Sequence, residues 1–576
     1  MIGQYAAHTS AMPDAVVVRP SAASAHADAS ARAASVAFAG AALLTVAAPF
    51  ETLEPLVRLP GQSISNLEAA MLVAFAAWGA AVAASRRLPV WRTPLVLPWM
   101  ALLLACAVSS LASPVSRVNA LHMTGRLGAA FGVYLLAVNG VTTASRLRRA
   151  IVLAIATACV VSLLAILEYF RVAVVLQWLK QFRPSVTEVG ALVRAGGPLY
   201  ATIASMYLEI VFALGLGLLL WTLDSGRRAW TAAAFAALLA IAEAIALTFT
   251  RAGWIAMAAS LAWVVAARFR GRGVDAGVRL LIALAVAVAA LFVTSRSAEA
   301  MWLRLTSESQ ESWYRAAIDA PAALTFAPGA KAIVPVRVTN TGRLTWDSDD
   351  DSPFFFSYHW RLLDSDRYAA FEGIRTRFET AVQPAASTVV LAEVQAPRRP
   401  GRYRLVWDIT QEHRLWFSTE PGAVPATTVA TIEGTPSTAP VATTPPTPPF
   451  ERPGRLTLWR AAVRMFAAHP LLGVGPDNFR LSYGGYAGLR RADARVHSNN
   501  MYLEMLAGGG LLAGAAFAWL LVRAGRVLRG EGALAAGVAA ACVAIAVHGA
   551  FDSFLSFAPT YVMFALVLGY ADAHRV

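Results

Sequence analysis

Apolar runs of about 20 residues, the length that crosses a bilayer as a helix, recur through both ends of the chain. They fill most of residues 34–300, which we assign to transmembrane helices 1–9, and return from residue 500 to the end. The pattern predicts a multi-pass α-helical membrane protein with about 12 transmembrane helices. We place them at 34–50, 67–84, 95–112, 121–139, 150–172, 201–223, 229–249, 252–267, 278–294, 500–522, 533–549 and 559–573.

The stretch between these two groups has a different pattern. Its runs, such as "AIVPVRVTNTG", "TVVLAEVQAP" and "GRYRLVWDITQ", alternate apolar and polar residues and end at Gly, Pro, Asn or Asp. Such runs favour an all-β sandwich, which we place at 321–434. The words "NTGRLTW", "YHWRLLD" and "PGRYRLVWD" resemble immunoglobulin-like modules found beside bacterial cell-envelope enzymes. A Thr/Pro-rich linker is predicted at 435–454, before an outer loop at 455–499 that leads to the last helices at 500–576.

The loops between the predicted helices alternate in charge. Clusters around residues 86–92, 146–149, 227–228, 268–272 and 523–529 carry two or more arginines each. The positive-inside rule places these loops, and with them both termini, in the cytoplasm. The long stretch 295–499 and the turn at Arg251 then face the periplasm of a bacterium, with the helices in its inner membrane. Residues 1–33 lack a basic segment ahead of an apolar one, so we expect a disordered cytoplasmic tail rather than a cleaved signal.

Composition agrees with a membrane protein. The chain is 57% hydrophobic and 15% charged, with a mean hydropathy of +0.54, which exceeds what a soluble core needs. Because the net charge of +14 lies largely in short loops, we attribute it to topology and expect no nucleic-acid partner. Membrane lipid is the expected surrounding. Cys106, Cys159 and Cys542 fall in apolar runs, so neither a disulfide framework nor a thiolate metal site is expected.

The candidate chemistry lies in polar residues at the outer ends of helices. The sequence contains no glycine-rich phosphate loop, no metalloprotease helix and no G-x-S-x-G elbow. Arg251, in "LTFTRAGW", is the clearest candidate, because an ionisable group at membrane depth costs roughly 3 kcal/mol and is retained where it is used or paired. The other candidates are Arg126, Arg194, Arg455, Arg460, His497 and Glu504.

Arginines around one histidine suit a substrate that carries a pyrophosphate and reacts through a hydroxyl. Guanidinium groups grip phosphate oxygens bidentately and stabilise a departing pyrophosphate without a metal or other cofactor. A histidine takes the proton from an attacking alcohol, and we expect the arginines to lower its pKa. Glu504 would orient His497, or would simply be favoured by the helix dipole. This constellation points to glycosyl transfer.

Three blocks of the sequence resemble the O-antigen ligase and polymerase family of bacterial envelope glycosyltransferases. They are "AEAIALTFTRAGWIAMAASLAW", "LWRAAVRMFAAHPLLGVGPDNFRLSY" and "HSNNMYLEMLAGGGLLAG", and "RAGGPLYATIASMYL" is a weaker match. The resemblance implies a GT-C-like membrane fold and the transfer of an undecaprenyl-pyrophosphate-linked glycan to an acceptor hydroxyl in the periplasm. A ligase uses a lipid A-core sugar as acceptor, in lipopolysaccharide biosynthesis, and a polymerase uses another glycan repeat unit.

The resemblance also assigns roles to residues. Arg251 matches the arginine that faces the donor diphosphate, and His497 matches the histidine proposed as base or donor-binding group. The family often has His-x-His-Asn where this chain has "HSNN", so His497 would act alone. The inserted sandwich is a second departure from the family pattern.

Other interpretations remain open at this stage. The "HSNN" cluster could simply cap the helix that follows, with Asn499 as a capping residue, and Arg126 with His122 could extend to the outer interface instead of lining a cavity. A polysaccharide transporter or flippase would also have many helices and buried arginines, although no internal repeat is found. In a third class, the helices would anchor a scaffold whose sandwich binds a glycan or a protein.

Overall fold

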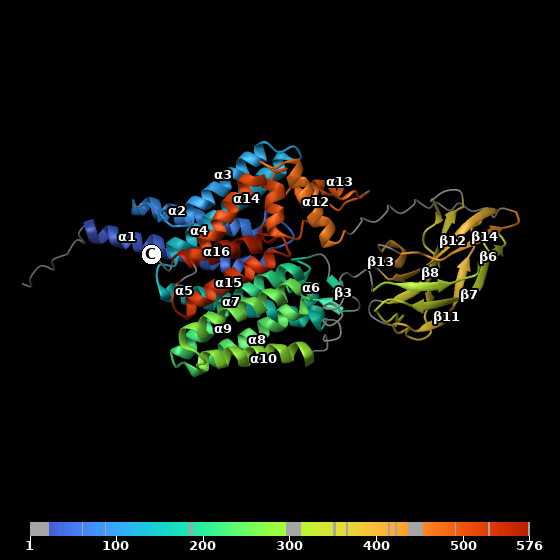
Figure 1. Cartoon of the computed structure of the whole chain (residues 1–576), viewed down its shortest axis with the longest axis horizontal. Coiled ribbons are helices and arrows are strands. Elements are labelled where there is room, and N and C mark those ends of the chain that lie inside the picture. The colour runs from blue at the N-terminus through green and yellow to red at the C-terminus, as the bar shows by residue number, and fades with distance from the viewer. Residues whose placement is uncertain are drawn as a thin grey trace, which may run out of the picture.

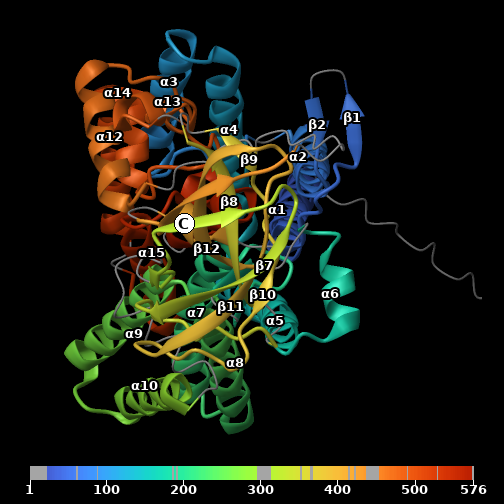
Figure 2. The same ribbon diagram turned by 90° about the vertical axis from the view of Figure 1, so that its right-hand side faces the viewer.

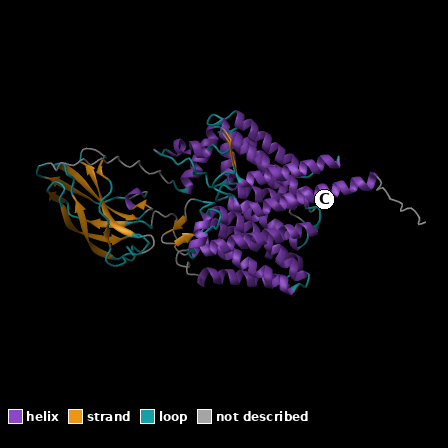
Figure 3. Ribbon diagram, turned by 180° about the vertical axis from the view of Figure 1, so that it is seen from behind, coloured by secondary structure: helices purple, strands orange, loops and turns teal. Residues whose placement is uncertain are grey.

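The computed structural model separates into a body of helices and a region of strands (Figure 1, Figure 3). The structure describes residues 22–59, 62–86, 88–183, 187–189, 192–294, 313–349, 353–363, 367–412, 415–420, 423–435, 453–489, 491–527 and 530–573.

A helix lies at each of the twelve positions predicted from the sequence. The helices are α1 (Ala22–Ala47), α2 (Asn66–Ser85), α3 (Val96–Leu111), α4 (Arg117–Gly140), α5 (Ala144–Tyr169), α7 (Ala201–Asp224), α8 (Arg228–Leu247), α9 (Arg251–Arg272), α10 (Ala276–Thr294), α14 (Met501–Val527), α15 (Ala533–Gly549) and α16 (Ala558–Ala573). Within the described residues, nine helices are long and apolar enough to span a membrane. The apolar helices α3, α15 and α16 have only 16, 17 and 16 residues. The multi-pass helical fold of an integral membrane protein is therefore confirmed, with fewer full-length spans than predicted.

The N-terminal helix is longer than the sequence predicts. α1 begins at Ala22, within the segment predicted to be a disordered tail, and residues 1–21 of that segment lie outside the described residues.

α7 forms the centre of the helical body. It packs against α15, α8, α5 and α9, and 94% of its apolar window is buried. Close packing with α15 depends on two glycines, because a Cβ added to Gly217 would lie 2.8 Å from the Cα of Gly537. Small residues allow helix backbones to approach in this way where lipid supplies no hydrophobic driving force.

Short elements gather at one end of the body, here called the loop end. They are α6 (Ala173–Leu179), α12 (Arg455–Ala468), α13 (Phe479–Ala487), and the hairpins of β1 (Val57–Leu59) with β2 (Gln62–Ile64) and of β3 (Thr187–Val189) with β4 (Leu192–Arg194). Figure 1 shows α6, β3, α12 and α13 on the side of the body toward the strands. Figure 2 looks at the molecule from that side, with the strands in front.

The inserted β region spans residues 316–432 and contains two sheets. One has the order β11 (Ser387–Gln395), β7 (Lys331–Asn340) and β5 (Ala316–Asp319). The larger sheet has seven strands. Five of them follow the order β10 (Thr376–Arg377), β8 (Phe354–Leu362), β12 (Gly401–Gln411), β14 (Thr427–Ile432) and β6 (Ala323–Phe326). The other two are β9 (Tyr368–Ala370), which pairs with β8, and β13 (Leu415–Trp416), which pairs with β12. Because β14 and β6 are parallel, this sheet is mixed. The predicted β insertion is confirmed as a mixed β-sheet region.

Alternating burial explains how the β region holds together. Every second residue of β7 and β11 is buried through most of each strand, as expected when one face of a sheet is solvated. The buried side chains of both sheets, including Val336, Val390, Trp360 and Trp407, belong to one hydrophobic cluster.

α14 is interrupted near its first third, and a distant segment fills the break. Gly510 has φ 64° and ψ −161°, which no helix allows. Residues 470–476, "PLLGVGP", run alongside and bond with backbone groups that the break leaves free. The bonds are Leu511 N–H to Pro470 O (2.8 Å), Val474 N–H to Ala507 O (3.0 Å) and Gly475 N–H to Gly508 O (2.7 Å).

Glycines make this contact possible. Gly473 has φ +65°, and a Cβ there would lie 2.4 Å from the carbonyl oxygen of Gly508. On the other side of the segment, the hydroxyl of Ser109 in α3 donates to the carbonyl of Leu472 at 2.5 Å. The segment 470–476 is thus held between α3 and α14 by its own backbone.

We predict that Gly510→Ala destabilises the protein. An alanine would be forced into a glycine conformation, and its Cβ would lie 2.4 Å from the carbonyl carbon of Leu471, so we expect a loss of about 1–3 kcal/mol. Thermal unfolding in detergent measures the effect. The matched control is Gly525→Ala in the same helix, where a Cβ meets open space; equal melting temperatures for the two variants would contradict the prediction.

Candidate active site

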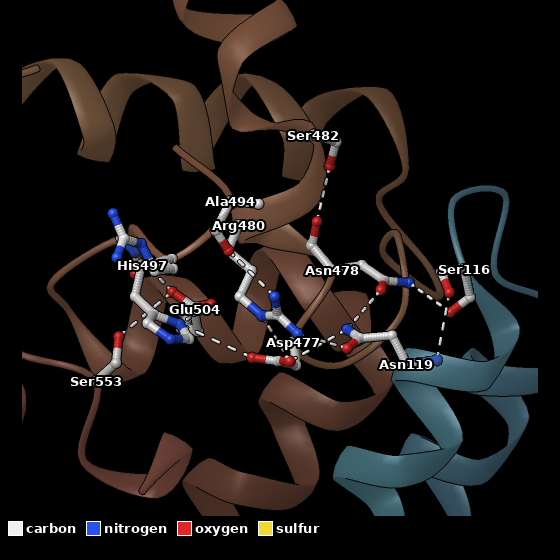
Figure 4. A network of polar contacts seen from close by, with 12 residues as sticks. Ser116, Asn119, Asp477, Asn478, Arg480, Ser482, Ala494, His497, Glu504 and Ser553 are labelled. Carbon is white, nitrogen blue, oxygen red and sulfur yellow. Dashed lines mark hydrogen bonds and ion pairs between the residues drawn. The ribbon is translucent and has the colours of Figure 1, made fainter. Parts of the chain in front are cut away.

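His497 and two carboxylates form the centre of a polar network at the loop end. His497 Nδ1 lies 3.3 Å from Glu504 Oε1 and 3.8 Å from Asp477 Oδ1. Figure 4 shows the three side chains pointing toward one another. Glu504 also accepts the backbone N–H of Ser498 at 2.8 Å, so the carboxylate is fixed from two directions.

Asp477 is positioned by the segment that fills the break in α14. It directly follows Pro476 and has φ +63°. Its Oδ2 accepts from Arg480 Nε at 2.8 Å, and Arg480 in turn donates to Asn119 of α4 at 2.6 Å. The side chain of Asp477 also faces His497 (Figure 4).

The electrostatic surroundings of His497 differ from the sequence-based expectation. Burial lowers the pKa of His497, but the hydrogen bond to Glu504 and the charges of Glu504 and Asp477 outweigh burial. Arg480 opposes them and is not sufficient, so the net pKa lies above the ordinary value of 6.5. The expectation that arginines lower this pKa is wrong, because carboxylates are the nearer groups.

The same three residues could, by spacing, hold a metal ion. One ligand atom from each of Asp477, His497 and Glu504 lies within 4.8 Å of the others, and imidazole with carboxylates suits several divalent metals. Arg480, however, already supplies a cation to Asp477 at 2.8 Å. The contacts are those of an ion-pair network, and we assign no metal to it.

The cap of α14 is Asn500, not Asn499. The side-chain oxygen of Asn500 accepts the N–H groups of Tyr502 (3.0 Å) and Leu503 (2.9 Å), and its amide donates to the carbonyl of Ala550 at 3.0 Å. Asn499 instead has φ +53° and turns the chain ahead of the helix. Capping and the His497 network therefore coexist in the "HSNN" cluster, on different residues.

Arg194 is held against the turn that precedes Arg251. Its Nε donates to the carbonyl of Thr248 at 3.0 Å and its Nη2 to the hydroxyl of Thr250 at 3.1 Å. Burial lowers the pKa of Arg194 to about 10, and the charge of Asp552 opposes the shift. Arg194 thus remains protonated at neutral pH.

Arg251 and Arg455 join the same neighbourhood from different helices. Arg251 is the first residue of α9 and Arg455 the first residue of α12. They are close enough for their charges to repel. Asp552 lies within electrostatic reach of Arg455, His497 and Arg194. The structure therefore brings together candidates as far apart in the sequence as Arg194 and His497, which are separated by 303 residues.

Two candidates lie apart from this group. Arg126 is exposed on α4, and its charge acts on Glu51. Its neighbours Met123 and Leu127 line a cavity of about 30 Å³ together with Glu504, but Arg126 does not line it. Arg460 is exposed, because five residues from Arg455 place it on another face of the helix. In the described part of the chain Arg460 shares no hydrogen bond or ion pair with the group.

Three residues of this region were missed from the sequence. Asp552 lies in the turn "GAFDSFLSF", where burial raises its pKa while Arg455, His497 and Arg194 lower it. Glu209 of α7 and His548 of α15 form a fully buried pair, with Oε2 and Nδ1 2.7 Å apart. The signal was a carboxylate and an imidazole inside apolar runs, where ionisable residues are costly unless paired.

Part of this site matches a known family. Residues 439–518 match a protein-family model described as O-Antigen ligase (Wzy_C). The match includes α12, the segment 470–476, His497 and the start of α14, whereas Arg194 and Arg251 lie outside it. No curated protein matches this chain. The chain thus contains a segment similar to the O-antigen ligase family within a multi-pass helical protein.

We predict that Asn500→Ala lowers stability by about 1 kcal/mol, because two N–H groups of α14 lose their acceptor. Asn499→Gly should leave stability nearly unchanged, because glycine readily adopts a positive φ. The thermal unfolding midpoints of both variants in detergent provide the test. A larger loss for Asn499→Gly would show that the cap lies at Asn499 after all.

Proposed function

We propose that this protein is an O-antigen ligase-like glycosyltransferase, which transfers a glycan from a lipid pyrophosphate to an acceptor hydroxyl. The proposal is supported by the match of residues 439–518 to the O-antigen ligase model and by the multi-pass helical body. The arginine pattern of the loops supports an arrangement with both termini in the cytoplasm and the loop end in the periplasm. The sequence blocks further support undecaprenyl pyrophosphate as the carrier.

The convergence of Arg194, Arg251 and Arg455 carries the proposal. Two like charges, on Arg251 and Arg455, lie close enough to repel, which favours an anion with several negative oxygens between them. A pyrophosphate group fits this requirement, and guanidinium groups bind its oxygens bidentately. As the bond between the anomeric carbon and the pyrophosphate oxygen breaks, the electron pair moves onto the pyrophosphate. The arginines stabilise that charge, and no metal is needed.

His497 is the proposed base. As the acceptor oxygen forms its bond to the anomeric carbon, the hydroxyl proton moves to the imidazole. Glu504 orients the ring through Nδ1 at 3.3 Å, which leaves Nε2 as the basic nitrogen and stabilises the imidazolium that forms. Asp477 adds to this stabilisation from 3.8 Å.

The acceptor decides between ligase and polymerase. Both reactions use the same bond changes, with a lipid A-core sugar or another glycan unit as the nucleophile. We propose the ligase because the matching family model carries that description. The polymerase remains the alternative within the same chemistry.

The β region is proposed to be an immunoglobulin-like sandwich at about residues 321–434, joined to the catalytic loop by the linker at 435–454. Two sheets that share one hydrophobic cluster support this assignment. Greek-key modules pack two sheets around a core in the same way.

We predict that Arg251→Lys reduces kcat by about 10²-fold, as loss of one preorganised donor does in other enzymes. Lysine keeps the charge but loses the planar fork. The assay uses purified protein in detergent with a pyrophosphate-linked glycan donor, an acceptor and a chelator. Arg270→Lys, at the exposed far end of the same helix, is the matched control, and equal rates for both variants would contradict the role of Arg251.

We predict that transfer declines as the pH falls through a value above 6.5, because His497 must be neutral to accept a proton and its pKa is raised. Glu504→Gln removes the main raising group, so the acid limb of the kcat profile should move to lower pH. In Glu504→Gln, Asp477 still raises the pKa of His497 and Arg480 still lowers it.

His497→Ala is the reference for this experiment and should lose transfer at every pH. If Glu504→Gln leaves the acid limb in place, the titrating group is not His497. If His497→Ala transfers as fast as the parent, the histidine is not the base.

A further inference from the structure

The β region contains a cavity that the proposed reaction does not use. Its volume is about 240 Å³, the share of about eight liquid waters and room for a single sugar ring. It lies where β5 begins, beside β12 and the segment after β13. The polar or exposed side chains that line it include Arg315, Thr341, Asp408, Ser418 and Val424.

Asp408 gives this cavity a fixed wall. Its side chain is only 2% exposed. One carboxylate oxygen accepts the N–H groups of Ile409 (2.8 Å) and Ser418 (3.0 Å), and the other pairs with His359 Nε2 at 2.9 Å. A wall with so many bonds is preorganised, which reduces the cost of ordering it around a ligand.

Asp408 links the cavity to a group of aromatic rings, because its partner His359 contacts them. The imidazole stacks on Phe371 with 4.3 Å between ring centroids and meets Trp416 edge-on at 4.5 Å. Tyr368 contacts Phe371 at 5.0 Å. Phe371, Trp416 and Tyr368 are each partly exposed, so the cluster is a shelf on the protein surface rather than part of the core.

Charged groups border the shelf, and one arginine there is shared by two carboxylates. Arg375 lies over the ring of Trp416 at 4.6 Å. It is paired with Glu372 at 2.6 Å and with Glu412 at 3.1 Å. The carboxylates retain lone pairs that can accept hydroxyl hydrogens, because each oxygen offers more than one acceptor site.

We propose that this cavity and its aromatic shelf form a glycan-binding site for the sugar chain of the lipid-linked donor. A sugar offers C–H faces, which pack on rings, and vicinal hydroxyls, which pair with carboxylate and guanidinium groups. Nucleic acid would require an excess of cations, whereas the carboxylates here balance the arginines. The choice of a glycan rests on the proposed function, since a chain that transfers a glycan has that polymer at hand. Figure 1 draws β13 on the side of the β region toward the helical body.

The test measures binding separately from transfer. Full-length protein in nanodiscs is titrated by calorimetry with the envelope polysaccharide of a strain that carries the gene, released from its lipid by mild acid. We expect saturable binding that Val424→Trp weakens at least tenfold, because Val424 is 90% exposed at the cavity and can be enlarged without disturbing the core. Trp416→Ala should weaken binding through the shelf.

Leu391→Ala is the matched control, since Leu391 is 55% exposed on β11 of the other sheet; it should bind like the parent. Absence of binding by the parent, or unchanged affinity in both Val424→Trp and Trp416→Ala, would overturn the proposed site. Arg251→Lys should bind the polysaccharide normally. The parent protein could bind the polysaccharide, lose that binding in Val424→Trp, and yet transfer no glycan. In that case the proposed function fails and the glycan site stands.

Discussion

The break in α14 is the constraint on which the candidate active site depends. A helix interrupted in a membrane protein exposes N–H and carbonyl groups that lipid cannot satisfy, so another backbone must bind them. The segment 470–476 does this through bonds to Ala507, Gly508 and Leu511. Because Asp477 follows that segment directly and His497 and Glu504 flank the start of α14, the same bonds set the distances within the polar network.

Around this fixed centre, the two proposed halves of the reaction come from different parts of the chain. The base and its carboxylates belong to the segment matched by the ligase family. Arg194 of β4 and Arg251 of α9 lie outside that match, whereas Arg455 of α12 lies within it. Asp552 lies within electrostatic reach of Arg194, Arg455 and His497, so a carboxylate connects the cationic part of the site with the imidazole.

The sequence predicted the elements better than their contacts. Apolar runs located the twelve predicted helices, though not the short helices α6, α12 and α13, and alternation located the β region, because both patterns are local. The sequence could not reveal that the segment 470–476 fills the break in α14, since the glycines it contacts lie more than 30 residues away. Asn499 and Asn500 have the same chemistry, and only the backbone angles decide which one caps. Arg455 and Arg460 lie apart because a helix turns them to different faces. The raised pKa of His497 depends first on Glu504 and then on Asp477, which the fold brings close to the imidazole.

The Glu209–His548 pair has a consequence for how the protein is made. Its partners are 339 residues apart, so at roughly 5–20 residues per second the ribosome needs roughly 20–70 seconds to supply the histidine after the glutamate. During that interval α7 resides in the bilayer with an unmatched acid. An acidic residue at mid-helix costs roughly 3 kcal/mol on insertion, which its many leucine, isoleucine and phenylalanine neighbours offset at roughly 0.5 kcal/mol each. The dense apolar sequence of α7 is thus a requirement of synthesis as well as of packing.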